Sequence, residues 1–306
     1  MKRLPILMIV GVSLLAVGCG APSSGALGPA PTATAKPSSP AVSPGTGTAN
    51  AAPSPSGQRP TATPTQGPAR EIGLQAWFSR NGKLFVTKRT VPATTGIGQA
   101  ALDRMLTGPS AAEYAAGLRS RIPAGTTVRG VRISAGIATV DLSSSFESAA
   151  SPSAMPLRIA QVVYTLTQFP TVTGVRFAIN GQGVTVVGGV PVQSPQTRAM
   201  YSGYLPAITV RSPVIGARVT SPVTVSGTAN VFEATVSVRI LDSAGREIAR
   251  TFTTASCGTG CRGSYSVPVT YKVAKEQPGT IVVHDDDAAG TGTPPHSVRI
   301  PVTLAP

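Results

Sequence analysis

The chain has 306 residues and a formal net charge of +14, yet only 12% of its residues are charged, about half of the usual share. Glycine (33 residues) and proline (29) are abundant, whereas aromatic residues make up only 5%. This composition argues against a single compact cytosolic enzyme and against a coiled coil, and the length predicts about two domains. Only two histidines occur, which leaves little for histidine-based metal sites or catalytic triads.

The N-terminal segment has the pattern of a secretory signal. Lys2 and Arg3 give it a positive start, and residues 5–15 form an apolar stretch too short for a robust membrane span. Small residues then lead to Cys19 in Leu-Ala-Val-Gly-Cys, which resembles a bacterial lipoprotein box. The resemblance implies that residues 1–18 are a lipoprotein signal peptide and that lipidated Cys19 anchors an extracytoplasmic protein to the cell membrane. The same small residues also suit an ordinary signal peptidase, so plain secretion is the alternative.

Residues 19–69 are predicted to be the lipidated cysteine followed by a disordered linker. From residue 20 to residue 69 the chain has eleven prolines and no acidic residue, and most of the rest is Ala, Ser, Thr and Gly. Such a stretch cannot bury enough apolar surface to offset the entropy lost on ordering. We therefore expect a tether between the membrane and the domains that follow.

Residues 70–190 carry the patterns of an α+β domain. Strands are expected at 72–78, 84–86, 127–133, 137–142, 175–179 and 184–187. Helices are expected at 96–106, 110–118 and 155–169, where apolar residues recur at three and four positions. Asn81-Gly82 between the first two strands is a strong hairpin signal. This order predicts an antiparallel sheet with the helices packed on one of its faces.

The second half reads as an all-β domain over residues 207–306, after an interdomain linker at 191–206. Short strands recur about every ten residues, with turn residues between them. They are expected near 208–211, 217–228, 234–241, 247–255, 264–271, 280–284 and 297–304. Seven short strands in this length predict an immunoglobulin-like β-sandwich.

Cys257 and Cys261 are close in sequence, in Cys-Gly-Thr-Gly-Cys. An exported protein meets an oxidising compartment, so we expect a disulfide between them. The short loop can bring the two Cα atoms within ~7 Å. A zinc site would need two further ligands, and no other cysteine is available for it.

Several motifs resemble known families. The first domain contains, in order, Leu106-Thr-Gly-Pro109, Arg121-Ile-Pro-Ala-Gly-Thr126, Ala138-Thr-Val-Asp141-Leu142-Ser143 and Gln161-Val-Val-Tyr164-Thr165-Leu-Thr-Gln168-Phe-Pro170. These resemble the GerMN domain of sporulation and germination lipoproteins. The second half contains Ser212-Pro213, Ser221-Pro222, Val225-Ser-Gly227-Thr-Ala229 and Val231-Phe232-Glu233-Ala234. These are similar to the immunoglobulin-like domain of bacterial spore germination proteins, and the tandem order supports both assignments.

The sequence gives little indication of catalysis or of a cofactor. His284 beside Asp285 could belong to a catalytic triad with a serine, but nothing in the sequence resembles a nucleophile elbow. We therefore expect that the protein is not an enzyme and has no catalytic residue and no cofactor. The aspartates from Asp285 to Asp287 could bind Ca²⁺ through their oxygens, but they lack the spacing of an EF-hand, and a solvated turn is the simpler reading. Trp77 is either a contact residue or covered by a neighbouring element.

Positive charge is concentrated in the first domain. Residues 70–195 hold twelve Lys or Arg against five Asp or Glu. An electrostatic face is hypothesised from the clustered cations Lys83, Lys88, Arg89, Arg119, Arg121, Arg129 and Arg132. Outside the cytoplasm the fitting polyanions are lipid headgroups, wall polymers and acidic proteins, and the signatures of nucleic-acid binding are missing.

The resemblance implies a non-enzymatic binding or scaffold component of the cell envelope, linked to sporulation or spore germination. Its expected partners are the membrane, through the lipid anchor, and an envelope protein that the sequence does not identify. Two alternatives remain open. One is a wall-polymer binding module that recognises a polyanion, and the other is an accessory protein of an envelope sensor.

Overall fold

The computed structural model describes residues 70–149, 151, 153–286 and 296–306. The signal peptide, Cys19 and the tether expected over 1–69 lie outside the described residues, as does Asp287. Within the described ranges, no helix is both long and apolar enough to cross a membrane.

The predicted hairpin opens the first domain. Strands β1 (Glu71–Arg80) and β2 (Lys83–Pro92) pair in register along their full length. Asn81 and Gly82 form the turn, with φ values of 51° and 72°. A type I′ turn needs positive φ at both central residues, which Asn and Gly adopt most readily. The Asn-Gly signal in the sequence is therefore confirmed.

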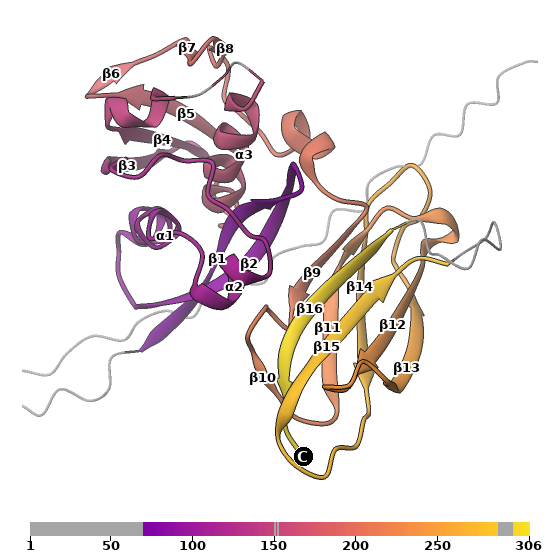
Figure 1. Cartoon of the computed structure of the whole chain (residues 1–306). Helices are drawn as coiled ribbons and strands as arrows, with labels where there is room; N and C mark the ends of the chain where they lie inside the picture. Colours follow the sequence, from indigo (N-terminus) through magenta and orange to yellow (C-terminus); the bar gives the residue numbers. More distant parts are fainter. Residues whose placement is uncertain (1–69, 150, 152, 287–295) are drawn as a thin grey trace, which may run out of the picture. The chain divides into compact units, whose positions relative to one another are not determined.

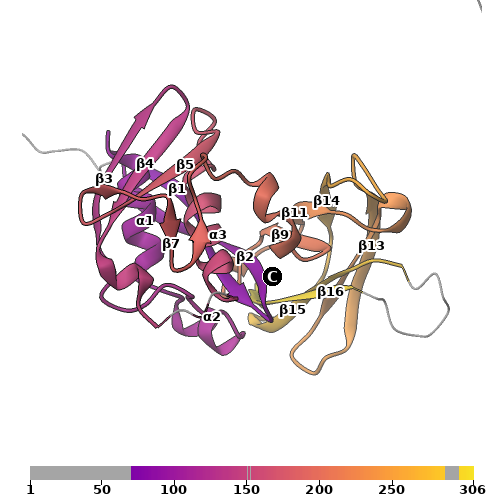
Figure 2. The same cartoon turned by 90° about the horizontal axis from the view of Figure 1, so that it is seen from above.

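The first domain has three layers. Its further elements are α1 (Ile97–Leu106), α2 (Ala111–Ala115), β3 (Val128–Ser134), β4 (Ile137–Leu142), α3 (Met155–Leu166), β5 (Gly174–Ile179), β6 (Gln182–Gly183), β7 (Val186–Val187) and β8 (Val190–Pro191). Strands β3, β4, β5 and β6 form one sheet, while β1–β2 and β7–β8 are separate two-stranded sheets. Helices α1 and α3 lie between the hairpin and the four-stranded sheet (Figure 1), and Figure 2 shows α1 beside β3 from above.

Helix α3 is the centre of this domain. All of its residues except Pro156 are buried, as expected for a helix covered on all sides. Pro156 stands in the first turn, where its missing N–H would have no partner within the helix. The helix packs against β1, β2, β5 and α1, so it joins the hairpin to the four-stranded sheet.

The sheet order differs from the expectation of a purely antiparallel sheet. Strands β3 and β4 pair antiparallel, as do β5 and β6, but β4 and β5 run parallel. The cause is α3, which carries the chain from the end of β4 back to the end of the sheet where that strand began. A helical crossover of this kind makes the two flanking strands parallel.

The second helix ends earlier than its expected limit at Leu118. Ser110 caps it as predicted, and Glu113 completes a capping box. Gly117 then takes a φ of 90°, which ends the helix in the left-handed region. Leu118 N–H still donates to the Glu113 carbonyl at 2.9 Å, and its side chain is fully buried.

The second domain is a sandwich of two sheets, as predicted. Its strands are β9 (Ile208–Ser212), β10 (Arg218–Val219), β11 (Val223–Ala229), β12 (Thr235–Leu241), β13 (Glu247–Thr254), β14 (Gly263–Val269), β15 (Gln277–His284) and β16 (Ser297–Leu304). One sheet has the order β10-β16-β15-β12-β13 and the other β14-β11-β9. Alternate residues of β11, β12, β14 and β16 are buried, so each sheet turns one face to the core.

The single strand expected over 217–228 is two strands in different sheets. Strand β10 pairs with β16, whereas β11 pairs with β14 and β9. Pro222 stands between them, and a proline cannot donate to a strand ladder. The chain therefore changes sheet at this point.

Candidate functional site

In the described part of the second domain, the histidines and aspartates do not form a triad with a serine. Asp285 is buried, accepts the His296 N–H at 2.9 Å, and lies 2.6 Å from His296 Nδ1 through its other oxygen. His284 Nδ1 lies 2.8 Å from the Asp285 carbonyl oxygen. Among the described residues, no hydroxyl group hydrogen-bonds to either histidine. The arrangement fixes the base of the loop that follows β15.

The carboxylates of the described residues do not gather around a cation site. No group of three or more His, Cys, Asp or Glu side chains lies close enough to hold a metal ion within the part of the chain that the structure describes. Asp286 Oδ1 accepts a hydrogen bond from the Ser237 hydroxyl at 3.1 Å. Asp285 is bonded to His296, and Asp287 lies outside the described residues.

The expected disulfide joins Cys257 and Cys261. Their Cα atoms are 5.8 Å apart, which is within the usual range for a disulfide. The bond closes the short loop between β13 and β14. It is a local clip in the sandwich.

The hypothesised electrostatic face is distributed over different layers. Lys83 and Lys88 are exposed on β2, Arg119 and Arg121 are exposed on the segment after α2, and Arg129 and Arg132 are exposed on β3. The hairpin and β3 lie on opposite sides of the helices, so the seven residues do not share one surface. Lys83, Arg119 and Arg121 lie near the hairpin turn, because Arg119 pairs with Ser79 and Arg121 Nε donates to the Ser79 hydroxyl at 2.9 Å.

Arg89 is a structural residue and not part of an open face. Its Nη1 and Nη2 atoms donate to both oxygens of Glu113 at 2.8 and 2.6 Å. The Glu113 side chain is almost fully buried and also accepts from Thr87 and from the Ser110 N–H. A paired, desolvated arginine of this kind is not free to meet a polyanion.

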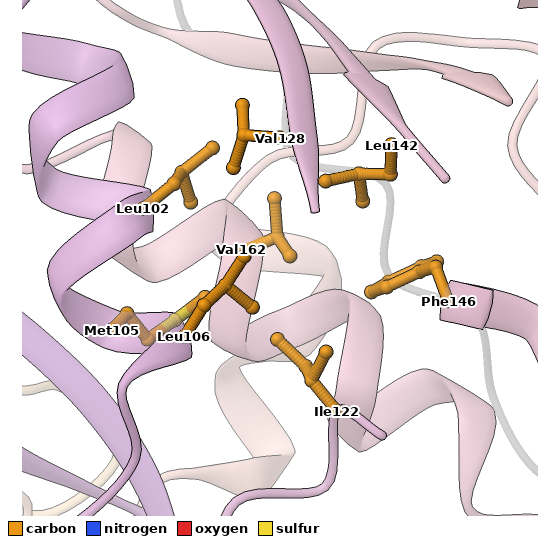
Figure 3. Close-up of a pocket in the computed structure, with 8 residues that line it drawn as sticks. All are labelled: Leu102, Met105, Leu106, Ile122, Val128, Leu142, Phe146 and Val162. Atoms are coloured by element: carbon orange, nitrogen blue, oxygen red, sulfur yellow. The ribbon is translucent and has the colours of Figure 1, made fainter. Parts of the chain in front are cut away.

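An apolar pocket of the first domain belongs to its core. Figure 3 shows that its side chains point toward one another from α1, α3, β3, β4 and the connecting segments. They are Leu102, Met105, Leu106, Ile122, Val128, Leu142, Phe146 and Val162. The space between them has no room for a water molecule. It is a packing gap and not a ligand site.

A second pocket, of about 310 Å³, is lined by three arginines and two aromatic rings. Arg198, Arg211 and Arg262 contribute the charges, and Trp77 and Tyr164 contribute the rings. Trp77 comes from β1 and Tyr164 from α3, while Arg211 stands on β9 and Arg262 just before β14. We call this set of five residues the arginine pocket.

Arg198 connects the rings of the arginine pocket to the chain beyond the first domain. The Trp77 and Tyr164 ring centroids are 4.8 Å apart, and the Arg198 guanidinium lies 4.7 Å from the Tyr164 ring and 5.6 Å from the Trp77 ring. Its Nε donates to Thr167 Oγ1 at 2.7 Å and its Nη2 donates to the Tyr164 carbonyl at 2.9 Å. The cation therefore lies against the faces of two aromatic rings, which it attracts. Trp77 is covered by neighbouring elements, which is one of the two alternatives predicted for it from the sequence.

The arginine pocket has an excess of positive charge. Arg262 donates from Nη2 to the Pro206 carbonyl at 2.6 Å, and Arg211 is exposed. Within the described ranges, none of the three arginines forms an ion pair. Burial lowers the pKa of the Arg198 guanidinium, Tyr164 acts in the opposite direction, and the nearby charge of Arg211 lowers this pKa further. Burial also lowers the pKa of the Arg262 guanidinium.

The sequence did not point to the three arginines of the pocket, although it singled out Trp77 as a possible contact residue. Arg198 lies within 191–206, which was expected to be a linker, but the structure forms a 3₁₀ turn there at Ala199–Tyr204. Arg211 and Arg262 stand far apart in the sequence and belong to no local motif. Their association depends on the packing of the first domain against the segment before β9. No signal at the level of sequence spacing would have found it.

The fold defines a two-domain protein, with a three-layer α+β domain followed in the chain by an immunoglobulin-like sandwich. Residues 77–185 match the sequence model of the Germane family, described as sporulation and spore germination. Residues 207–291 match the Gmad2 family, described as an immunoglobulin-like domain of bacterial spore germination. The chain therefore carries a GerMN-like domain followed by a Gmad2 domain, as the motif resemblance predicted.

Solved structures are similar to the same regions. The first GerMN domain of the sporulation protein GerM from Bacillus subtilis is 27% identical, with 42% of this chain and 98% of that chain covered and a TM-score of 0.37. A putative lipoprotein from Clostridium perfringens is 19% identical over 42% of this chain and 89% of its own, with a TM-score of 0.32. The tandem GerMN domains of GerM are 17% identical over 77% of this chain and 61% of theirs, with a TM-score of 0.37. No curated protein sequence matches the chain significantly.

Proposed function

We propose that this protein is a non-enzymatic, membrane-anchored lipoprotein that acts as a binding or scaffold component of the cell envelope in sporulation or spore germination. The observation that carries the proposal is the succession of the two matched domains in one chain, because both families are described by spore germination. The lipid anchor rests on the sequence before and at Cys19.

Contacts between the two domains support a scaffold role. The described residues of both domains belong to one compact unit of the chain. Arg80 Nη1 of the first domain donates to the Arg299 carbonyl of the second at 3.3 Å, and Lys83 Nζ donates at 2.8 Å to the carbonyl of Gly203, in the segment that joins the domains. A pair of domains held together in this way presents a larger continuous surface than either domain alone, which suits the recognition of another protein.

The charge of the first domain favours a second candidate function. The excess of Lys and Arg over residues 70–195 would attract an anionic wall polymer, and salt would weaken that attraction. The distribution of the exposed cations over different layers favours the first proposal, because a linear polyanion binds best to a continuous basic surface.

Cross-linking in intact cells that carry the full-length protein, followed by mass spectrometry of the adducts, tests the proposal. We expect the same few envelope proteins in repeated experiments, and a sensor protein among them would identify the accessory role. Adducts confined to wall fragments and lost at high salt would contradict the protein-scaffold role and support the polymer-binding module. Adducts drawn mainly from cytoplasmic proteins would overturn the extracytoplasmic assignment.

A further inference from the structure

The arginine pocket contains a buried donor without an acceptor. Trp77 is 4% exposed, and its indole Nε1 is buried with no hydrogen-bond partner among the described residues. Tryptophan N–H groups normally find a partner when they are buried. The orphaned indole N–H therefore calls for an acceptor in or beside the pocket that this residue lines.

The positive charges of the arginine pocket also favour a hydrogen-bond acceptor, and specifically an anionic one. Its lining includes three guanidinium groups and no carboxylate among the described residues. Arg198 uses its Nε and Nη2 for hydrogen bonds within the protein, and Arg262 uses its two Nη atoms. The Arg211 side chain makes no hydrogen bond or ion pair with another described residue, so its whole guanidinium fork is available. Arg198 and Arg262 are partly buried and Arg211 is exposed beside them, and three neighbouring cations without a counter-charge are stabilised by an anion.

The shape and the other lining groups narrow the class of anion. Guanidinium groups match the planar, two-oxygen edge of a carboxylate or phosphate. The Trp77 and Tyr164 rings and Leu205 supply apolar surface, and the hydroxyls of Thr209 and Thr228 supply polar contacts. A volume of about 310 Å³ is at the lower end of the range for small-molecule sites. The fitting ligand is a small organic molecule with one oxyanion head and an apolar body.

We propose that the arginine pocket binds a small organic oxyanion, a carboxylate or a phosphate monoester, whose oxygens accept from the Arg211 guanidinium and from the indole N–H of Trp77. This inference goes beyond the proposed envelope role and does not depend on it. The binding is measured on the purified protein and the envelope role in cells, so each can fail while the other stands.

The chain carries its own reporter for this test. Trp77 is its only tryptophan, so selectively excited tryptophan fluorescence reports on the pocket alone. We would titrate the purified full-length protein with benzoate and with phenyl phosphate at constant ionic strength, and with benzyl alcohol as the neutral analogue. A saturable change with either anion and none with benzyl alcohol is expected. The comparison of benzoate with phenyl phosphate decides which oxyanion the site prefers.

A matched pair of variants assigns the binding to the pocket. Arg211→Gln should weaken the preferred anion roughly tenfold, because a charge-assisted hydrogen bond is lost. Arg132→Gln removes the same charge from an exposed position on β3 and should leave the affinity unchanged. Neither side chain forms a hydrogen bond or ion pair with another described residue, so both variants should fold. A fluorescence response that is absent, that is equal for benzyl alcohol, or that falls equally in both variants would overturn the proposal.

Discussion

Gln161 of α3 donates from Nε2 to the carbonyl oxygen of Trp77 on β1, over 2.8 Å. The same side chain accepts the Arg121 N–H through Oε1 at 2.7 Å. Gln161 is fully buried, and its bond to the Trp77 carbonyl is shielded from water. One side chain of the helix therefore ties together the strand and the segment after α2.

This bond is one of a series along the edge of β1 that does not pair with β2. Gln168 accepts from the Gln75 N–H at 2.7 Å and donates to the Gln75 carbonyl at 2.9 Å. Ser79 exchanges two backbone hydrogen bonds with Arg119, at 2.9 and 2.8 Å. The edge is thus satisfied at alternate residues without a further strand, which protects it from pairing with another chain. Two residues of the recognised family motif, Gln161 and Gln168, have this physical role.

Gln161→Leu should destabilise the first domain by about 2–3 kcal/mol. The substitution leaves the buried Trp77 carbonyl and the part-buried Arg121 N–H without their partner. Gln99→Leu, at an exposed position of α1, is the matched control and should change stability by less than about 0.5 kcal/mol. Urea unfolding of the two variants and the parent measures the difference. Equal stabilities for both variants would contradict the role given to Gln161.

Glu113 should make stability depend on acid pH. Burial alone would raise the pKa of its carboxyl group, but hydrogen bonds from Arg89, Thr87 and Ser110 hold this pKa below its ordinary value of 4.5. A carboxyl whose pKa is lower in the folded state stabilises the fold above its unfolded pKa, and this contribution is lost as the pH falls through the folded pKa.

Glu113→Gln tests this dependence. At neutral pH the variant should lose about 3 kcal/mol, because Arg89 is left without its counter-charge in a largely buried site. The difference between the parent and the variant should shrink as the pH is lowered below the unfolded pKa of the carboxyl. Unfolding curves recorded from neutral to acid pH measure it. A difference that stays constant over this range would show that the Glu113 charge does not contribute.

The disulfide should be formed in the protein as purified and should stabilise the sandwich modestly. Thiol labelling of Cys257 and Cys261 without reductant is expected to be negative. Because the closed loop is short, the double change Cys257→Ser and Cys261→Ser should cost only about 2 kcal/mol. Reduced parent protein is the control and should unfold like the double variant. Two reactive thiols per chain before reduction would disprove the bond.

Local signals in the sequence predicted the elements that depend on local chemistry. Asn81-Gly82 predicted the hairpin turn, in which both residues have positive φ values. The apolar residues spaced at three and four positions predicted α3, which is buried. The parallel pairing of β4 and β5 has no local signature, because it depends on where the crossover helix returns the chain. The helix predicted to end at Leu118 ends at Ala115. The sequence alone does not show whether Gly117 continues the helix or ends it.

The arginine pocket was beyond prediction for a different reason. Arg198 and Arg262 each bond to backbone carbonyls of other segments, and such contacts leave no pattern in residue spacing. The hypothesis of an electrostatic face built from cations that are neighbours in sequence is wrong in part, because a charged side chain can form an ion pair inside the domain. Arg89 and Glu113 are the example, since their ion pair lies inside the domain.

The central claim is that a lipid at Cys19 holds the two domains at the cell membrane. Cell fractionation of the full-length protein and of its Cys19→Ala variant measures this. The account predicts that the parent is recovered with the membrane and that Cys19→Ala is released to the medium, with both proteins equally folded. Retention of Cys19→Ala in the membrane fraction would contradict the lipid anchor, and recovery of the parent in the medium would point to plain secretion.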